Sequence, residues 1–184
     1  MYVTIVGDKI STKPIKGTRP RGHTSGQDAF YEAELMGSVK DAAELVMIVD
    51  LERNDLGRIC EYGSVRVQAL RTVEKFATVQ HTVATIEGRV RAGVDVSDIL
   101  RATFPGGSIT GAPKIRAMQV IAELETARRG VYTGSLGYFD TGGAFDLSIA
   151  IRTVVARDGH ASMWAGSGIV ADSDPEEEYR ETMS

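Results

Sequence analysis

Hydrophobic and polar residues alternate at the start of the chain, in residues 3–6 and 9–12. The two runs are rich in β-branched side chains and flank Gly7-Asp8, a dipeptide typical of a tight turn. This pattern predicts a β-hairpin whose second strand continues towards residue 18. Residues 19–27, which carry arginine, proline and glycine, are expected to form a surface loop.

A helical spacing of apolar positions then replaces the alternation. It predicts a helix over residues 28–36 that resumes near Val39, with Leu45, Val49 and Leu56 on one face and a stop near Gly57. Alternation returns in residues 65–91, which predicts further strands of a sheet, and residues 96–102 predict a short helix.

The last part of the chain mixes both patterns. A glycine-rich loop, residues 104–114, leads into a predicted helix from Pro113 to about residue 127, and Pro113 suits the first helical turn because it has no N–H to leave unpaired. The next β-type runs, residues 132–139, 146–155 and 160–165, predict an antiparallel meander.

The segment Asp174-Pro-Glu-Glu177 has the form of a helix N-cap at Asp174 followed by a capping box. No glycine stop signal follows before Ser184. We therefore expect the chain to end inside this helix.

Composition and charge narrow the classes of function. The chain has 184 residues, of which 42% are hydrophobic and 25% charged, as in ordinary globular domains. A net charge of -4 gives no basic surface for nucleic acid, so no nucleic-acid partner is expected. The single cysteine, Cys60, excludes an internal disulfide, and no apolar run reaches the roughly 18 residues that a membrane helix needs. We expect a cytoplasmic protein with no membrane partner.

The glycine-rich loop precedes a helix N-terminus, where backbone amides can bind an anion. Ala112 and Pro113 stand where a nucleotide-binding loop needs lysine and serine or threonine, which excludes that function. A turn that only starts the helix and a loop that binds a carboxylate both remain open.

Acidic side chains crowd the last predicted helix. Glu178 and Glu181 are three residues apart and share a helix face. Such residues commonly serve for capping and solvation, whereas a minority hold Mg²⁺ through one or two carboxylates. A magnesium site would need a further carboxylate, for which Glu44, Asp50 and Glu52 are the candidates.

Two cations have alternative interpretations. Lys16 ends a predicted strand, where it is either solvated or, if desolvated, a nucleophile. Arg152 lies in an alternating run, either at the surface or as a bidentate carboxylate ligand. The histidines lack the spacing of a zinc site and no Gly-x-Ser-x-Gly segment occurs, which excludes metal-hydroxide and serine-hydrolase mechanisms.

A family resemblance rests on segments 14–22, 44–58, 104–114, 132–138, 149–153 and 165–182, among them Pro14-Ile-Lys-Gly-Thr18 and Tyr132-Thr-Gly-Ser135. Together they resemble the chorismate-utilising enzymes, the family of anthranilate synthase component I, aminodeoxychorismate synthase component I, isochorismate synthase and salicylate synthase. The segments follow the family order along nearly the whole chain.

The resemblance implies a role for each matching residue. Glu44 and Glu181, with Glu178 nearby, would bind Mg²⁺ and through it the ring carboxylate of chorismate. Ligands of the enolpyruvyl carboxylate would be Tyr132, Arg152 and the backbone of Gly166, Ser167 and Gly168. The pocket would be lined by Gly17, Thr18 and Ser108, with His81 near the departing hydroxyl.

Lys16 points to a subfamily, because anthranilate synthases resemble Pro-Ile-Ala-Gly-Thr at this motif and aminodeoxychorismate synthases carry the lysine. The resemblance implies that the Lys16 amine adds to C2 of chorismate and expels the C4 hydroxyl, after which ammonia attacks C4. Ammonia would come from glutamine through a glutamine amidotransferase subunit or domain. Anthranilate synthase and a non-catalytic module that retains metal and partial substrate binding are the alternatives.

The implied fold class is α+β, part of an α/β sandwich with mostly antiparallel sheet and flanking helices. Residues 1–184 would be the C-terminal part of the chorismate-binding domain, truncated at both ends. Relatives carry a Ser-Pro-Glu motif, with an acid/base candidate, before the segment that residues 1–6 resemble. We therefore expect the chain alone to be poorly active and to expose sheet edges.

Overall fold

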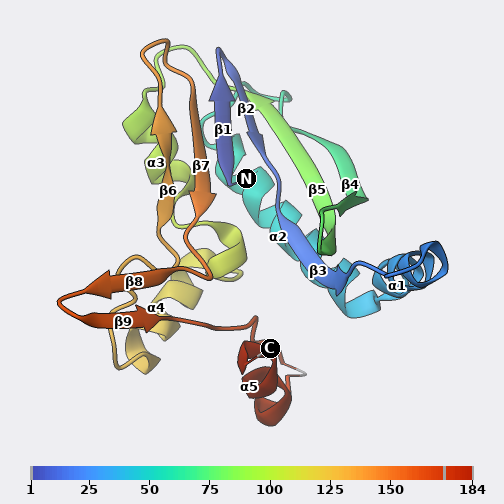
Figure 1. The fold of residues 1–184 in the computed structure, drawn as a ribbon. Coiled ribbons are helices and arrows are strands. Elements are labelled where there is room, and N and C mark those ends of the chain that lie inside the picture. The colour runs from blue at the N-terminus through green and yellow to red at the C-terminus, as the bar shows by residue number, and fades with distance from the viewer. Residues whose placement is uncertain (1, 172, 184) are drawn as a thin grey trace.

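The computed structural model describes residues 2–171 and 173–183, except for the side chain of residue 181 (Figure 1). Its strands are β1 (Val3–Val6), β2 (Lys9–Thr12), β3 (Ile15–Pro20), β4 (Arg66–Lys75), β5 (Val79–Arg89), β6 (Ser135–Phe139), β7 (Phe145–Ile149), β8 (Val154–Arg157) and β9 (His160–Met163). Its helices are α1 (Ser25–Gly37), α2 (Val39–Gly57), α3 (Val96–Thr103), the 3-10 turn η1 (Gly107–Ile109), α4 (Lys114–Leu124) and α5 (Pro175–Met183).

Seven strands form one antiparallel sheet, in which the order of paired strands is β3-β5-β2-β1-β7-β6. Along one edge, β5 pairs with β3 and then with β2, and along its opposite edge it pairs with β4. The expected hairpin is present, with Ile5 opposite Ile10. Its first strand pairs with β7 through Val3 and Leu147, so the beginning of the chain and its last third meet in the sheet. This pairing brings motifs from both ends of the sequence into one body.

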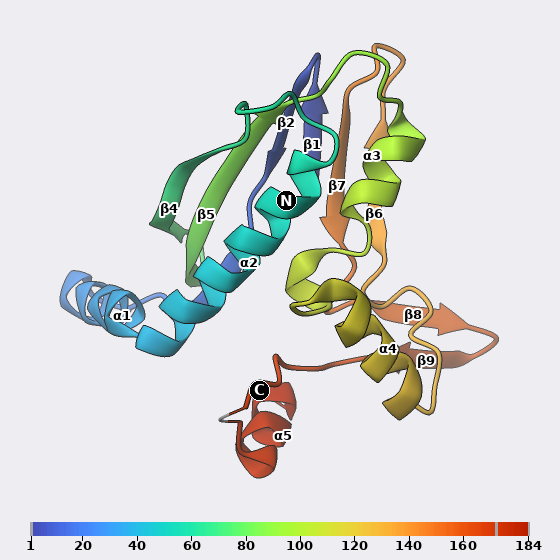
Figure 2. The same cartoon turned by 180° about the vertical axis from the view of Figure 1, so that it is seen from behind.

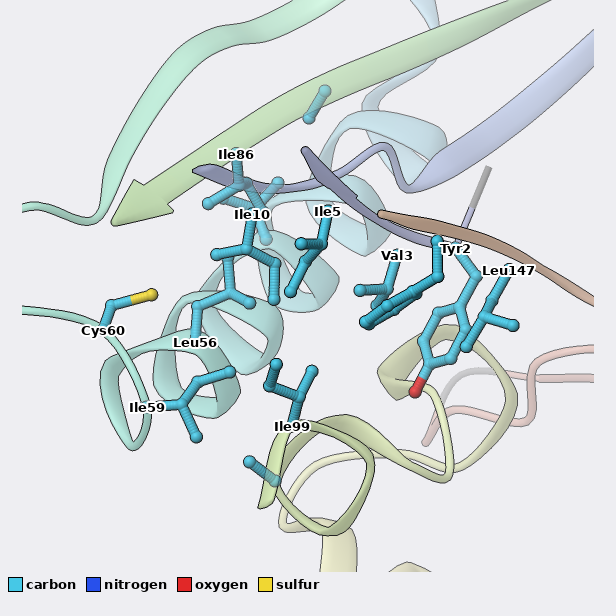
Figure 3. Packing of buried hydrophobic residues seen from close by; sticks show 14 of the residues in the cluster. Tyr2, Val3, Ile5, Ile10, Leu56, Ile59, Cys60, Ile86, Ile99 and Leu147 are labelled. Atoms are coloured by element: carbon cyan, nitrogen blue, oxygen red, sulfur yellow. The ribbon is translucent and has the colours of Figure 1, made fainter. Parts of the chain in front are cut away.

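Two helices cover one face of this sheet. Seen from behind, α2 crosses the strands β1, β2 and β5, and α3 lies over β6 and β7 (Figure 2). The core fills the space between helices and sheet, where Ile10, Leu56 and Ile99 approach one another from β2, α2 and α3 (Figure 3). Burial of these apolar side chains is the main source of stability for such a layer. The α+β class with antiparallel sheet and flanking helices is thus confirmed.

The predicted meander of the last three strands is wrong. The run expected as one strand over residues 146–155 is divided into β7, in the large sheet, and β8, which pairs only with β9 in a separate two-stranded sheet. Arg152 lies in the interruption with a φ of 52°, a left-handed backbone that interrupts regular strand pairing and is uncommon for a residue with a side chain. The chain turns there and leaves the sheet.

Most of residues 19–27 lie in a strand or a helix, so the prediction of a surface loop over this range is also wrong. Strand β3 continues to Pro20 because Arg19 and Pro20 pair with Gln80 and Val79 of β5. Helix α1 begins at Ser25, where the Thr24 hydroxyl accepts a hydrogen bond from the Gln27 amide. The loop is reduced to a few residues between them.

Other boundaries differ by a few residues. Pro113 is the N-cap of α4 and Lys114 its first helical residue, and α4 ends at Leu124. The predicted cap of the last helix is confirmed, since Oδ1 of Asp174 accepts hydrogen bonds from the amides of Glu176 and Glu177. Among the residues that the structure describes, no helix has the length and apolar character needed to cross a membrane.

Candidate functional site

Lys16 lies on β3 at a register irregularity against β5, between Lys16 and Thr18. Gly17 makes the irregularity possible with a φ of 74°. A Cβ at this glycine would lie 2.8 Å from Cδ1 of Leu35 and 2.9 Å from Cγ of Asp41, so a larger residue would displace these side chains and also strain the backbone. The bulge directs the Lys16 side chain towards α2, where Nζ lies 2.8 Å from Oε2 of Glu44.

Thr18 and His81 face each other across β3 and β5, with 2.8 Å between Oγ1 of Thr18 and Nδ1 of His81. Burial lowers the pKa of His81, and the nearby positive charge of Arg152 lowers it further, against smaller opposing effects of the Gly17 backbone and Glu74. Arg152 exerts this effect from the break between β7 and β8. The neutral imidazole is favoured there.

Residues 166–168 run between β9 and α5 and pass close to Tyr132 and to the Lys16–Glu44 pair. A Cβ at Gly166 would lie 2.8 Å from the Tyr132 hydroxyl oxygen. A Cβ at Gly168 would lie 3.4 Å from Nζ of Lys16 and 3.9 Å from Oε2 of Glu44. The segment therefore connects Tyr132 to the Lys16–Glu44 ion pair, and its glycines leave room for these side chains.

Glu178 is the buried residue among the described side chains of α5, with 6% of its surface exposed. Its Oε2 accepts a hydrogen bond of 2.6 Å from the Ser167 hydroxyl and its Oε1 one of 2.6 Å from the Ser173 hydroxyl. Nζ of Lys40 lies 3.8 Å from Oε1. The Ser167 and Ser173 hydrogen bonds lower the pKa of Glu178, so the carboxylate is held in its anionic form.

The positions of the carboxylates can be compared with what the predicted Mg²⁺ requires of its ligands. Glu44 and Glu178 both approach residues 166–168, Glu44 beside Gly168 and Glu178 through the Ser167 hydroxyl. Residues 2–171 and 173–183 contain no cluster of three or more metal-binding side chains, and the side chain of Glu181 lies outside the described residues. Two carboxylates with water and substrate oxygens are a donor set that suits Mg²⁺. The residues fit the metal, whose presence stays a prediction.

The chain matches, over residues 1–184, the family described as chorismate binding enzyme. It belongs to this family. It is 54% identical over 182 residues to aminodeoxychorismate synthase component 1 of Klebsiella aerogenes, covering 99% of this chain and 40% of that protein. It is 51% identical over 183 residues to anthranilate synthase component 1 of Streptomyces coelicolor, covering 100% of this chain and 36% of that protein.

A crystal structure of anthranilate synthase component I from Streptococcus pneumoniae TIGR4 superposes with a TM-score of 0.87 at 42% identity. The superposition covers 98% of this chain and 40% of that one. The chain thus spans about two fifths of the length of the relatives it matches.

Ser108 and a surface hollow both lie at the glycine-rich loop, residues 104–114. Ser108 is half-buried in η1, and no hydrogen bond joins its side chain to another predicted site residue within the described chain. A hollow of about 510 Å³ lies between the loop before η1, helix α4 and residues 125–134. Tyr132 lines this hollow, but Lys16, His81 and Arg152 do not. The hollow is therefore not assigned to the substrate.

The structure distinguishes between the three candidates for a further metal-binding carboxylate, Glu44, Asp50 and Glu52. Asp50 is exposed beside Arg53, and Glu52 points into the core, where Oε2 accepts a hydrogen bond of 2.7 Å from the Thr12 hydroxyl. Burial raises the pKa of Glu52 to about 7. Glu44 is therefore the candidate that faces Lys16.

Sequence reasoning missed a buried ion pair and the serine beside Glu178. Asp55 on α2 pairs with Lys114 at the start of α4, which fixes the end of the glycine-rich loop to the core helix. The sequence offered a signal for Lys114, a cation directly after the loop. Ser173 is one hydroxyl in a polar segment and carries no such signal.

Proposed function

We propose that the protein containing this chain is an aminodeoxychorismate synthase component I, which aminates chorismate at C4 towards p-aminobenzoate and folate. The observation that carries the proposal is Lys16, whose Nζ lies beside Glu44 and Gly168. A relative with this name and 54% identity supports it. A lysine at this motif is the residue by which the chain resembles the aminating subfamily.

The proposed reaction exchanges a hydroxyl group for an amine in two steps. The neutral Nζ of Lys16 forms a bond to C2 of chorismate, both conjugated double bonds of the ring shift by one position, and the C4–O bond breaks. The proton that Nζ loses balances the proton that the hydroxyl gains as it leaves as water. Ammonia then forms a bond to C4, the two double bonds return to their first positions and the C2–Nζ bond breaks. The proton that ammonia loses balances the one that Nζ regains, which regenerates Lys16.

Lys16 must be neutral to attack, so its ion pair with Glu44 has to open first. His81 would hydrogen bond the departing hydroxyl in its neutral form, which its environment favours. Thr18 orients the imidazole through Nδ1. Lys16 would therefore act as the nucleophile and His81, oriented by Thr18, as the contact of the leaving group.

The substrate carries two carboxylates that the site would bind separately. Tyr132, Arg152 and residues 166–168 would hold the enolpyruvyl carboxylate, with Gly17, Thr18 and Ser108 along the pocket. Glu44, Glu178 and Glu181 would hold Mg²⁺, which would neutralise the ring carboxylate when bound. Fixing both ends of the molecule holds the ring against Lys16.

The ammonia would come from glutamine through an amidotransferase partner, consistent with the designation component 1 of the relatives. Anthranilate synthase is the second candidate, because a relative of that name is 51% identical. The two functions use one substrate and differ in the product.

The protein in the full length that its gene encodes should be incubated with chorismate, Mg²⁺ and ammonium, coupled to a lyase that releases p-aminobenzoate. Formation of p-aminobenzoate is the expected result, and fluorescence of anthranilate without the lyase would favour the second candidate. The same assay on the 184-residue chain tests whether this part is catalytic by itself; turnover would exclude a purely binding role.

A further inference from the structure

Ser173 holds one oxygen of Glu178 in a defined direction. Its hydroxyl donates a hydrogen bond of 2.6 Å to Oε1 of Glu178 and accepts one of 3.0 Å from the Val170 amide. The Ser173 amide in turn donates to the Val170 carbonyl at 3.0 Å. The Ser173 hydroxyl is thus fixed on one side by Val170 and on the other by Glu178, before α5 begins.

Ser173 does not serve as the helix cap. The cap is Asp174, whose Oδ1 accepts hydrogen bonds from the amides of Glu176 and Glu177 at 3.0 and 3.1 Å. The amide of Glu178 donates to the Asp174 carbonyl at 3.0 Å. The Ser173 hydroxyl is therefore directed to the carboxylate of Glu178 and not to the backbone of α5.

The second oxygen of Glu178 is held in the same way from the other side. Ser167 donates to Oε2, and residue 168 is the one whose Cβ would approach Lys16 and Glu44. An ionised carboxylate has about four lone-pair directions. The two serines occupy one on each oxygen, which leaves one on each oxygen for a cation.

We infer that Ser173 is a positioning residue for Glu178, which together with Ser167 fixes the carboxylate in the orientation in which it binds Mg²⁺. The inference rests on the proposed function, in which Glu178 is a magnesium ligand. Hydrogen bonds to a ligating carboxylate commonly determine metal affinity, and loss of such a partner typically weakens binding about 10–100-fold. Ser173 acts through Glu178 and takes no part in the chemistry.

The test uses the full-length protein and Mg²⁺ alone, titrated by calorimetry without substrate. Ser173→Ala is expected to weaken Mg²⁺ binding about 10–100-fold, whereas Ser173→Thr, which keeps the hydroxyl, is expected to bind Mg²⁺ close to the wild type. The Mg²⁺ concentration for half-maximal turnover should rise in Ser173→Ala by a similar factor. Thermal midpoints measured in EDTA check that each variant is folded.

Ser64→Ala is the matched control. The Ser64 hydroxyl also donates within a turn, to the Glu61 carbonyl at 2.8 Å, and accepts from the Arg89 amide at 3.1 Å. It lies at the other end of α2 from Glu44 and should leave Mg²⁺ affinity unchanged. An equal loss in Ser64→Ala would mean that any broken turn weakens the metal site, and the inference would fall.

Three results separate the inference from the proposed function. Wild-type affinity in Ser173→Ala, with a large loss in Glu178→Gln, would overturn the role of Ser173 and leave the magnesium site intact. Equal losses in Ser173→Ala and Ser173→Thr would also overturn it, because the hydroxyl would then not be responsible. Wild-type affinity in Glu178→Gln would refute the proposed metal role of Glu178 itself.

Discussion

Nζ of Lys16 and Oε2 of Glu44 lie 2.8 Å apart across the boundary between β3 and α2. If Lys16 forms the covalent bond to substrate, Lys16→Ala should abolish aminodeoxychorismate formation, because no other group supplies the amine that bonds to C2. The coupled p-aminobenzoate assay measures this. Lys9→Ala, which removes an exposed lysine paired with Glu87 on the neighbouring strands, is the control and should keep its activity. Full activity in Lys16→Ala would refute the covalent role.

His81 should titrate at higher pH once Arg152 is removed. Burial and the Arg152 charge lower the pKa of His81, so Arg152→Gln should raise this pKa towards its ordinary value. The folded state then binds fewer protons than the unfolded state just below pH 6.5, so the free energy of unfolding falls as pH falls through this range, and falls less in Arg152→Gln. Chemical shifts of labelled imidazole carbons measure the pKa. Arg157→Gln, on exposed β8, should not move it.

Glu52 should make stability depend on pH in the opposite sense. Burial raises its pKa from 4.5 to about 7 beside Thr12, Asp55 and Lys114, so the folded state holds an additional proton between these pH values. The free energy of unfolding therefore decreases as pH rises from about 5 to 8, by on the order of 2–3 kcal/mol. Glu52→Gln should remove this decrease. Urea unfolding of both proteins at the two pH values measures this decrease. The same decrease in Glu52→Gln would show that Glu52 is ionised in the core.

Removing one partner of the Lys114–Asp55 ion pair should lower the stability of the fold. Lys114→Met leaves the Asp55 carboxylate buried without a partner, which we expect to lower the free energy of unfolding by about 3–5 kcal/mol. Arg116→Ala breaks an exposed pair with Glu123 on the same helix and should cost about 1 kcal/mol or less. Denaturant titration compares them. Equal costs would mean that Asp55 is solvated in the protein.

Glu181 is expected to matter more for the metal than its neighbour on the same helix. Glu181→Ala should weaken Mg²⁺-dependent substrate binding, whereas Glu176→Ala removes an exposed carboxylate paired with Arg180 and should have little effect. Binding of chorismate at several Mg²⁺ concentrations measures both. Equal effects would show that the helix face is assigned incorrectly.

Local signals in the sequence were sufficient for part of the fold. The turn at Gly7-Asp8 predicted the first hairpin, and Asp174 predicted the cap of α5, because both depend on neighbouring residues. Helix α1 had a similar signal that was overlooked, since Thr24 and Gln27 have the spacing of a capping pair and the Gln27 side chain accepts from the His23 amide.

The division of the last strands could not be predicted in the same way. The alternation continues through Ile149 and Thr153 without a glycine or proline, and the left-handed backbone of Arg152 is imposed by pairing on either side, β7 with β1 and β8 with β9. The same holds for the site. The family motifs identified Lys16 and Glu44 as site residues. Their contact could not be predicted, because it depends on how β3 packs against α2.

Helix α5 is attached to the rest of the protein through a carboxylate, since Tyr179 and Met183 are exposed and Glu178 is buried. In Figure 1 this helix stands away from the large sheet. Its backbone amides should therefore exchange with deuterium through local opening, at a free energy below that of global unfolding. The amides of β2 and β5 should exchange only when the core unfolds. A cation at Glu178 would slow exchange in α5 first, so the metal would complete the folding of the element that binds it.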